Sequence, residues 1–492
     1  MEILRIDGDL VFLLFHASEA AEVGETFQII EKPDNAKGIV VQIVSNDSHQ
    51  YPGIEQELIQ IILENRLSTT NSPLNQELGL GEIRNLKVAK AKIRKKIENS
   101  EWMPWDGWIP TRNVEVTQVS AEVLCDRIMP SPSFPITFLK YKNEAISIDG
   151  PMLDQINVIT GVKGSGKSHV SKHLAISLSH QGIPCVVFDV NGEYSNLPNV
   201  LTLRWGENFL PDLAELDYWI LLQIVDLINP LPETSRAEFE HSLAVHFGAR
   251  KRYCEEQNLP FSIDIPYLQN LTWAGGTYVQ DAIRRRLEHV NHLNLFVREG
   301  QQTADIYTDF NQIYEAACNG SPLVIDLRSQ KLQMQKTLTN ILISQLEKIC
   351  KIESENGGLK RFPFVFFEEA HLYIDESGIM NIITRGRHIG ISSVFVTNTP
   401  EKLPDNVFRQ LDNLFLLNLT HKDDIRRVSE NSFTDEETIE SFSTRMLPRH
   451  ALIIGRVTDR YPIIFDVDPL PPNVPPTGVT RTPWSRFVSQ NH

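Results

Sequence analysis

The sequence lacks several features that would fix its cellular context. It contains no run of about 18 or more apolar residues, so no segment is expected to span a membrane. Its first residues lack a basic stretch followed by an apolar one, the pattern of a secretory signal. The five cysteines are scattered without a C-x-x-C pair, which indicates reduced structural thiols rather than a disulfide framework. These absences favour a cytoplasmic protein.

An excess of positive charge is also lacking. The 492-residue chain has a net charge of −16, with 41% hydrophobic and 22% charged residues. This composition is typical of a globular protein, and the length is enough for about two to four domains. The acidic balance argues against a nucleic-acid coat protein. It leaves open a protein that contacts nucleic acid through a small basic lining.

One stretch carries a complete phosphate-binding motif, G-x-x-x-x-G-K-[ST]. The apolar residues before it predict a buried strand, and residues 169–180 predict a helix whose positive N-terminal end favours phosphate. We expect Lys167 to reach the β- and γ-phosphates of ATP and the Ser168 hydroxyl to ligate Mg²⁺. The expected nucleotide-binding residues here are Gly161, Val162, Lys163, Gly164, Ser165, Gly166, Lys167, Ser168 and His169.

A second apolar run, residues 184–190, reads P-C-V-V-F-D-V and predicts a parallel strand buried on both faces. It leads into the segment D-V-N-G-E-Y that begins at Asp189. Ligands of open α/β sheets bind at the carboxyl ends of the strands. We therefore add Asp189 and Glu193 to the expected nucleotide-binding residues.

A third apolar run, residues 362–371, reads F-P-F-V-F-F-E-E-A-H and ends in two adjacent carboxylates. This is the layout of a Walker B strand. One carboxylate orders Mg²⁺ and its waters, and the next polarises the water that attacks the γ-phosphate. We assign Glu368 to the metal and Glu369 to the water.

The remaining patterns predict an α/β core with a largely parallel sheet of at least six strands. Further strands are expected at 322–327, 391–398, 414–419 and 451–455, and a helix at 333–352. Helical periodicity at 213–228, 235–257 and 278–296 predicts an insertion, in which Arg284–Arg286 are more consistent with an exposed face than with a DNA contact. The expected ATPase core covers 136–205 and 321–468, the insertion 206–320 and an extended tail 469–492.

The N-terminal part, residues 1–135, is expected to form a small β-rich domain with strands at 4–15, 26–31, 38–44 and 114–123 and a helix at 51–66. Its basic run, 86–96, could contact nucleic acid, although a solvated strand face is favoured. Trp102, Trp105 and Trp108 could form a stacking platform or a partner surface, although packing in a barrel core is favoured. Residues 130–135 are expected to be a linker.

In their order along the chain, these motifs resemble the HerA branch of the HerA–FtsK superfamily of ring ATPases. Three features depart from the family pattern: Glu368 replaces Asp, Asn398 replaces Gln and Lys163 replaces Thr. The resemblance rests on the segments Gly161–Ser168, Asp189–Tyr194, Glu368–His371, Arg385–Gly390 and Thr397–Pro400.

The resemblance implies a RecA-like core with an N-terminal small β-barrel of the HAS type. It also implies a homo-hexamer that binds ATP between subunits, with Arg387 or Arg385 as an arginine finger and Asn398 as a sensor. Double-stranded DNA would pass through the central channel, and a separate nuclease or NAD-consuming effector would dock near the barrel, in DNA end processing or antiviral defence. One alternative is a ring scaffold that gates an effector without processive movement on DNA. A small-molecule phosphotransferase is disfavoured by the paired carboxylates and the insertion.

Overall fold

The computed structural model describes residues 1–16, 21–32, 37–47, 86–111, 113–129, 131–298, 306–355, 362–430 and 433–474. The chain forms two compact units. Unit 1 contains residues 1–133, 139–149 and 416–467, and unit 2 contains 134–138, 150–415 and the residues from 468 onward. The helix expected at 51–66 and most of the expected tail lie outside the described residues. None of the described helices is long and apolar enough to cross a membrane.

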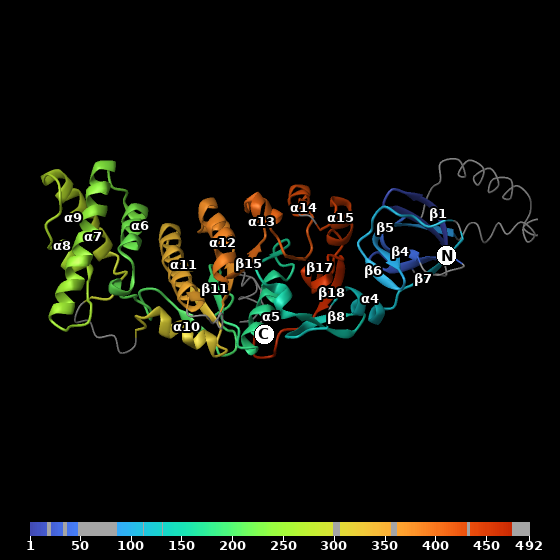
Figure 1. Cartoon of the computed structure of the whole chain (residues 1–492), viewed down its shortest axis with the longest axis horizontal. Coiled ribbons are helices and arrows are strands. Elements are labelled where there is room, and N and C mark those ends of the chain that lie inside the picture. The colour runs from blue at the N-terminus through green and yellow to red at the C-terminus, as the bar shows by residue number, and fades with distance from the viewer. Residues whose placement is uncertain are drawn as a thin grey trace, which may run out of the picture. The chain divides into compact units, whose positions relative to one another are not determined.

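Unit 1 begins with an antiparallel sheet (Figure 1). Its strands follow the order β1 (Glu2–Asp7), β2 (Leu10–His16), β5 (Leu86–Glu98), β4 (Lys37–Asp47), β3 (Thr26–Glu31) and β7 (Val114–Gln118), with β6 (Glu101–Met103) beside β5. The single strand expected at 4–15 is wrong. Gly8 turns the chain with a φ of +62°, a conformation that glycine adopts without strain, so the segment forms the β1–β2 hairpin.

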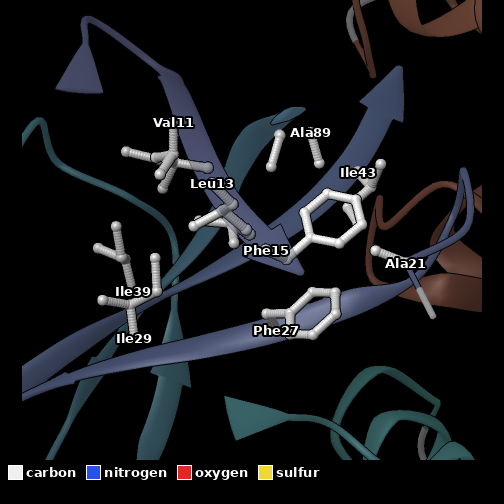
Figure 2. Packing of buried hydrophobic residues seen from close by; sticks show 12 residues of the cluster. Val11, Leu13, Phe15, Ala21, Phe27, Ile29, Ile39, Ile43 and Ala89 are labelled. Carbon is white, nitrogen blue, oxygen red and sulfur yellow. The ribbon is translucent and has the colours of Figure 1, made fainter. Parts of the chain in front are cut away.

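The core of this sheet comes from side chains that alternate along each strand. Val11, Leu13 and Phe15 on β2 point to one face, where Phe27 and Ile29 of β3 meet them (Figure 2). Each fully buried side chain of this size contributes about 1.5–3 kcal/mol of hydrophobic stabilisation. Two of the three tryptophans, Trp105 and Trp108, pack against this cluster, which confirms the expected core role for them.

The basic run forms strand β5, but the expectation of a solvated strand face is wrong. Lys92, Lys95 and Lys96 are each less than 10% exposed. Their ammonium groups meet carboxylates within unit 1. Helix α15 (Glu436–Ser443) and its N-cap, which pack on the sheet, supply the partners of Lys90 and Lys92, and other segments supply those of Lys95 and Lys96. The ion pairs are Lys90–Glu437, Lys92–Asp435, Lys95–Asp459 and Lys96–Asp106.

Unit 1 also contains elements from distant parts of the sequence. Strand β17, expected from its apolar run, pairs antiparallel with β18, and β18 pairs antiparallel with β8. The sequence patterns missed β8, β9 and β18, which are short or half-exposed. Besides the sheet described first and α15, unit 1 thus contains α4 (Ala121–Ile128), β8 (Pro135–Tyr141), β9 (Glu144–Asp149), α14 (Lys422–Ser429), β17 (His450–Gly455) and β18 (Ile463–Val467).

Unit 2 is built on a sheet whose central strands are parallel, which confirms the expected α/β class. The continuous apolar runs form its buried strands, as expected for strands covered on both faces. The strand order is β12 (Leu201–Leu203), β13 (Leu323–Asp326), β11 (Cys185–Asp189), β14 (Phe364–Glu368), β15 (Ser392–Thr397), β10 (Ile156–Thr160) and β16 (Asn413–Leu416).

Helices cover both faces of this sheet. The connection through α5 (Lys167–His180) runs from β10 toward β11, whereas those through α11 (Leu332–Glu355) and α12 (Glu376–Ile389) run in the opposite direction. Because parallel crossovers are right-handed, the two directions place α5 on one face and α11 and α12 on the other, as Figure 1 shows. Two shorter helices, α10 (Phe310–Cys318) and α13 (Asp405–Arg409), complete the layers.

The insertion is helical, as expected. Helices α6 (Tyr218–Ile228), α7 (Glu233–Glu256), α8 (Ile265–Gln269) and α9 (Thr277–His292) pack together (Figure 1). In the arginine triplet, Arg284 and Arg285 are exposed. Arg286 instead donates hydrogen bonds to backbone carbonyls at the end of α6 and just after it, with distances of 3.1 Å to Asn229 and 2.8 Å to Pro230.

Candidate nucleotide site

Parallel register gathers the chemically important residues of unit 2 at one edge of the sheet. Thr160, the last residue of β10, pairs with Thr397, the last residue of β15. Glu368, the last residue of β14, pairs with Val396. Asp189 ends β11, the neighbour of β14 on its other side. The carboxyl ends of four strands therefore meet where ligands of open α/β sheets bind.

The phosphate loop joins β10 to α5. Gly164 and Gly166 have φ angles of +82° and +113°, which side-chain-bearing residues rarely adopt, and Gly166 caps the N-terminus of α5. Lys167, the first residue of α5, is 9% exposed and donates hydrogen bonds to the carbonyl oxygens of Gly161 (2.9 Å) and Val162 (3.1 Å). Its ammonium group is therefore held over the loop.

His169 follows the motif, and its groups are engaged away from the loop centre. Its backbone N–H donates to the Gly166 carbonyl at 3.0 Å. Its ring Nε2 lies 2.7 Å from the Asp468 carbonyl oxygen, which the ring of His173 also contacts at 2.8 Å. The two histidines thus tie α5 to the chain that follows β18. A direct role of His169 in nucleotide binding stays a prediction.

Asp189 organises the segment that follows β11. One of its oxygens accepts the backbone N–H groups of Asn191 (3.1 Å), Gly192 (2.6 Å) and Glu193 (3.2 Å). The other accepts the N–H of Tyr194 at 3.0 Å. Four N–H donors to a completely buried carboxylate indicate that Asp189 shapes this segment, which in turn presents Glu193.

Gly192 lies against the side chain of Arg328, which follows strand β13. The φ of Gly192 is +73°, which favours glycine, and a Cβ here would come within 2.2 Å of the Arg328 side chain, which would have to move. Arg328 is held by Asp326 at the end of β13, with hydrogen bonds of 3.0 and 2.6 Å. Arg204 donates to the same carboxylate at 3.2 Å. Sequence analysis missed this network because its arginines follow no motif.

Glu368, the expected metal ligand, is 4% exposed. Burial raises its pKa well above the usual value, and the negative charge of Asp189 and a hydrogen bond with that side chain raise it further. Its Oε2 atom has no hydrogen-bond partner in the part of the chain that the structure describes. A buried carboxylate oxygen without a donor is the expected state of a group that receives a cation.

Glu369, the expected water-activating residue, is 8% exposed and has a left-handed backbone with φ of +50°. That conformation costs roughly 1–3 kcal/mol in a residue other than glycine, and such strain clusters at functional sites. Its N–H donates to the Val396 carbonyl at 2.7 Å, which fixes the strained turn to β15. Burial raises the pKa of its carboxyl, against hydrogen bonds from Thr397 and Asn398 that lower it.

The end of β15 holds the Glu369 carboxylate. The Thr397 hydroxyl donates to Oε2 at 3.0 Å, and the backbone N–H of Asn398 donates to Oε1 at 3.1 Å. His371 Nδ1 lies 3.7 Å from Oε2, and its Nε2 lies 3.5 Å from the Thr399 hydroxyl. The expected sensor residue, Asn398, thus contacts Glu369 through its backbone. The Thr397 hydroxyl, for which no role was expected, makes the side-chain contact.

The two arginine-finger candidates lie near the C-terminal end of α12. Arg385 is exposed, and its positive charge acts on Glu347 of α11, whose pKa burial raises. Arg387 follows two residues later, so the two positions lie about 200° apart around the helix. They therefore occupy different faces of α12, and one arginine cannot simply substitute for the other.

These residues fit a nucleoside triphosphate with a divalent cation. The glycine loop and the α5 N-terminus supply N–H donors for phosphate, with Lys167 above them. Several buried oxygens of the site lack hydrogen-bond partners within the described ranges: Thr160 Oγ1, Ser165 Oγ, Glu193 Oε2 and Glu368 Oε2. Strand, glycine loop, helix and paired carboxylates together define a P-loop ATPase.

Comparison with known proteins identifies the branch. Residues 137–346 match the family model described as "Helicase HerA, central domain". The "DNA double-strand break repair helicase HerA" of Saccharolobus solfataricus is 22% identical over 460 residues, 90% of this chain and 87% of the relative. The protein of the same name from Sulfurisphaera tokodaii is 24% identical over 332 residues, covering 63% of this chain and 64% of the relative. These matches support a HerA-type ATPase of the HerA–FtsK superfamily.

Solved structures show more distant likeness. The conjugative coupling protein TrwB matches with a TM-score of 0.47 and 13% identity, covering 73% of this chain and 94% of that one. VirB4 of Thermoanaerobacter pseudethanolicus matches with a TM-score of 0.45 and 14% identity, covering 70% of this chain and 98% of that one.

Proposed function

We propose that the chain is the subunit of a homo-hexameric, ATP-driven translocase or helicase acting on double-stranded DNA, with a RecA-like core and a closed N-terminal barrel. The observation that supports this proposal most directly is the site at the carboxyl edge of the unit 2 sheet, where a phosphate loop faces two buried carboxylates. The names of the HerA relatives supply the DNA substrate. The resemblance to the HerA family supports the ring.

Nucleotide binding falls to the phosphate loop. Lys167 and the loop N–H groups hold the phosphates of ATP, and Ser168 and Glu368 hold Mg²⁺, partly through water. Bound there, Mg²⁺ would supply positive charge that offsets the negative charge of the phosphates. Burial and the negative charge of Asp189 raise the pKa of Glu368, so its anionic form gains from a cation bound beside it.

Hydrolysis falls to Glu369. Its carboxylate orients and deprotonates the attacking water, while Thr397 and the Asn398 N–H keep it in place. Arg387, or alternatively Arg385, reaches the site of the adjacent subunit and stabilises charge on the γ-phosphate. Hydrolysis then depends on ring assembly.

A separate effector, a nuclease or an NAD-consuming enzyme, completes the proposal. We place its docking site near the N-terminal barrel and its role in DNA end processing or antiviral defence. The basic strand β5 does not supply the DNA contact, because acidic residues of unit 1 already pair with its lysines. DNA contacts are expected from the loops that line the channel.

The test is steady-state ATP hydrolysis with and without duplex DNA at two salt concentrations, with Lys167→Ala as the inactive control. We expect DNA to stimulate hydrolysis several-fold, and higher salt to weaken that stimulation because phosphate contacts release counterions. Hydrolysis indifferent to DNA at both salt concentrations would contradict the motor. It would favour instead a ring scaffold that gates its effector, the role that the Glu368 and Asn398 departures also fit.

A further inference from the structure

The end of strand β13 carries a charged network outside the phosphate loop. Asp326, its last residue, is 4% exposed and accepts hydrogen bonds from two arginine side chains. Arg328 donates to one carboxylate oxygen through Nε at 3.0 Å and to the other through Nη2 at 2.6 Å, and Arg204 donates at 3.2 Å. A guanidinium bound by two parallel hydrogen bonds has a fixed orientation. The Arg328 side chain is therefore held in one place.

The guanidinium of Arg328 lies against the segment that follows β11. A Cβ added to Gly192 would come within 2.2 Å of the Arg328 Cδ and Nε atoms and within 2.3 Å of Cζ. Parallel register explains this proximity. Asp189 pairs with Asp326, and the N–H of Leu327 donates to the Asp189 carbonyl at 2.9 Å, so the chain leaves both strands side by side. Arg328 thus fills the space beside the Gly192 backbone.

The same segment also contacts the helix that follows the phosphate loop. Tyr194 is completely buried, and its hydroxyl is hydrogen-bonded to the Ser171 hydroxyl on α5. Between this contact and Gly192 lies Glu193, an expected nucleotide-binding residue. Its backbone N–H, like that of Gly192, donates to Asp189. The backbone around Glu193 is therefore held by Arg328 on β13 and by α5.

We propose that Arg328 is a positioning residue that supports the backbone at Gly192 and thereby holds Glu193 at the nucleotide site. Asp326 orients Arg328, and Arg328 acts through the segment rather than on the nucleotide. Arg204, which follows β12, donates to the same carboxylate and provides a matched comparison. The effect of Arg328 on hydrolysis rests on the proposed function and on the expected role of Glu193.

A double-mutant cycle in thermal unfolding tests the contact without relying on activity. Gly192→Ala places a Cβ where the Arg328 side chain lies, and moving that side chain would break its hydrogen bonds with Asp326. We expect Gly192→Ala to lower the melting temperature. In an Arg328→Ala background the loss should be roughly half as large or less, because only the cost of the positive φ remains.

The same cycle with Arg204→Ala is the control, and there the loss caused by Gly192→Ala should stay as large as in wild type. A loss of equal size in the wild-type and Arg328→Ala backgrounds would overturn the contact. If Gly192→Ala alone does not fold, a folded Gly192→Ala/Arg328→Ala variant supports the contact. An unfolded double variant alongside folded Arg328→Ala overturns it.

Hydrolysis kinetics test whether the contact positions Glu193. With rates divided by the number of nucleotide-binding sites, we expect Arg328→Ala to raise KM for ATP about three- to tenfold and to leave kcat within about twofold, because a binding group is displaced. Arg204→Ala should stay near wild type. In a Glu193→Gln background, Arg328→Ala should raise KM much less, because the group that it positions has already been altered.

Three results would contradict this role: an unchanged KM in Arg328→Ala, an equal rise in Arg204→Ala, or the full rise persisting in the Glu193→Gln background. Each would show that Arg328 does not act through Glu193. If wild type itself does not hydrolyse ATP, the proposed function fails, while the unfolding cycle still decides whether Arg328 supports the segment.

Discussion

Two charge-rich regions of the molecule use lysines and carboxylates in opposite ways. On strand β5 of unit 1, Lys92 and Lys96 meet acidic partners, and the pKa values of Asp435 and Asp106 are lowered. At the sheet edge of unit 2, burial raises the pKa values of Glu368 and Glu369. The pKa values of these carboxylates are thus shifted down in unit 1 and up at the sheet edge of unit 2.

The difference has a physical reason. A carboxylate with a lowered pKa is stabilised as an anion by groups already present, so it needs no additional cation. A carboxylate with a raised pKa is desolvated without full compensation and gains from a cation or a proton. Keeping such a group charged in the folded protein costs free energy. A cation bound beside it would reduce this cost, as expected at a ligand-binding site.

Replacing the arginine finger should produce the largest effect, because its charge is proposed to reach the γ-phosphate from a neighbouring subunit. We expect Arg387→Ala to lower kcat by about 10³-fold or more and to leave ATP affinity near normal. Steady-state hydrolysis and nucleotide titration measure the two quantities, and the same measurements on Arg385→Ala show which of the two arginines is the finger. Lost ATP binding together with a preserved catalytic rate would contradict the assignment of Arg387 as the arginine finger.

Replacing the water-activating residue should come next. Glu369→Gln keeps the shape and removes the base, so kcat should fall about 10²- to 10³-fold with ATP still bound. Glu437→Gln is the matched control in unit 1, where the same change removes an ion pair with Lys90 and should leave kcat unchanged. Similar losses of kcat in Glu369→Gln and Glu437→Gln would contradict the proposed difference between the two regions.

Removing the group that holds Glu369 should have a smaller effect. Thr397→Val deletes the hydroxyl that donates to Oε2 while keeping the shape, and we expect kcat to fall about tenfold with KM unchanged. Thr397→Ser keeps the hydroxyl and should stay near wild type. Identical kcat values in the Val and Ser variants would show that this hydrogen bond does not position the base.

The smallest effect is expected in unit 1, and it concerns stability. Burial opposes ionisation of Asp435, but hydrogen bonds from Lys92 and Thr438 lower its pKa to about 2. Because the side chain is 40% exposed, solvent screening leaves about 1 kcal/mol. A depressed folded-state pKa gives stability that is present above the unfolded value near 3.8 and is lost as pH falls through about 2.

Asp435→Asn tests this ion pair. Its free energy of unfolding at neutral pH should drop by about 1 kcal/mol, and the gap from wild type should shrink as pH falls toward 2. Urea unfolding across this pH range measures both. A gap that persists unchanged at the acid end would mean that the carboxylate charge is not its source.

Much of unit 2 could be predicted because its local patterns agree with its tertiary structure. The apolar runs before Gly161 and Glu368 admit only buried strands, and parallel strands must bring their carboxyl ends together. The three-residue strand β12 carries too little pattern to be recognised.

Unit 1 shows why the basic run was misinterpreted. A stretch of alternating lysines is usually solvated, and nothing near it in the sequence contradicts that interpretation. The carboxylate that pairs with Lys92 lies 343 positions away, in Asp435. Only the folded chain brings the two together. The Thr397 hydroxyl was overlooked for the same reason, since its partner Glu369 lies 28 positions earlier.

The most direct test of the contrast is ATP binding measured by titration calorimetry on wild type, Lys167→Ala and Lys92→Met. Both variants remove one nearly buried lysine. We expect Lys167→Ala to lose ATP binding, whereas Lys92→Met should keep wild-type affinity and stoichiometry but unfold at a lower temperature. Wild-type affinity in Lys167→Ala, or equal loss in both variants, would contradict this expectation.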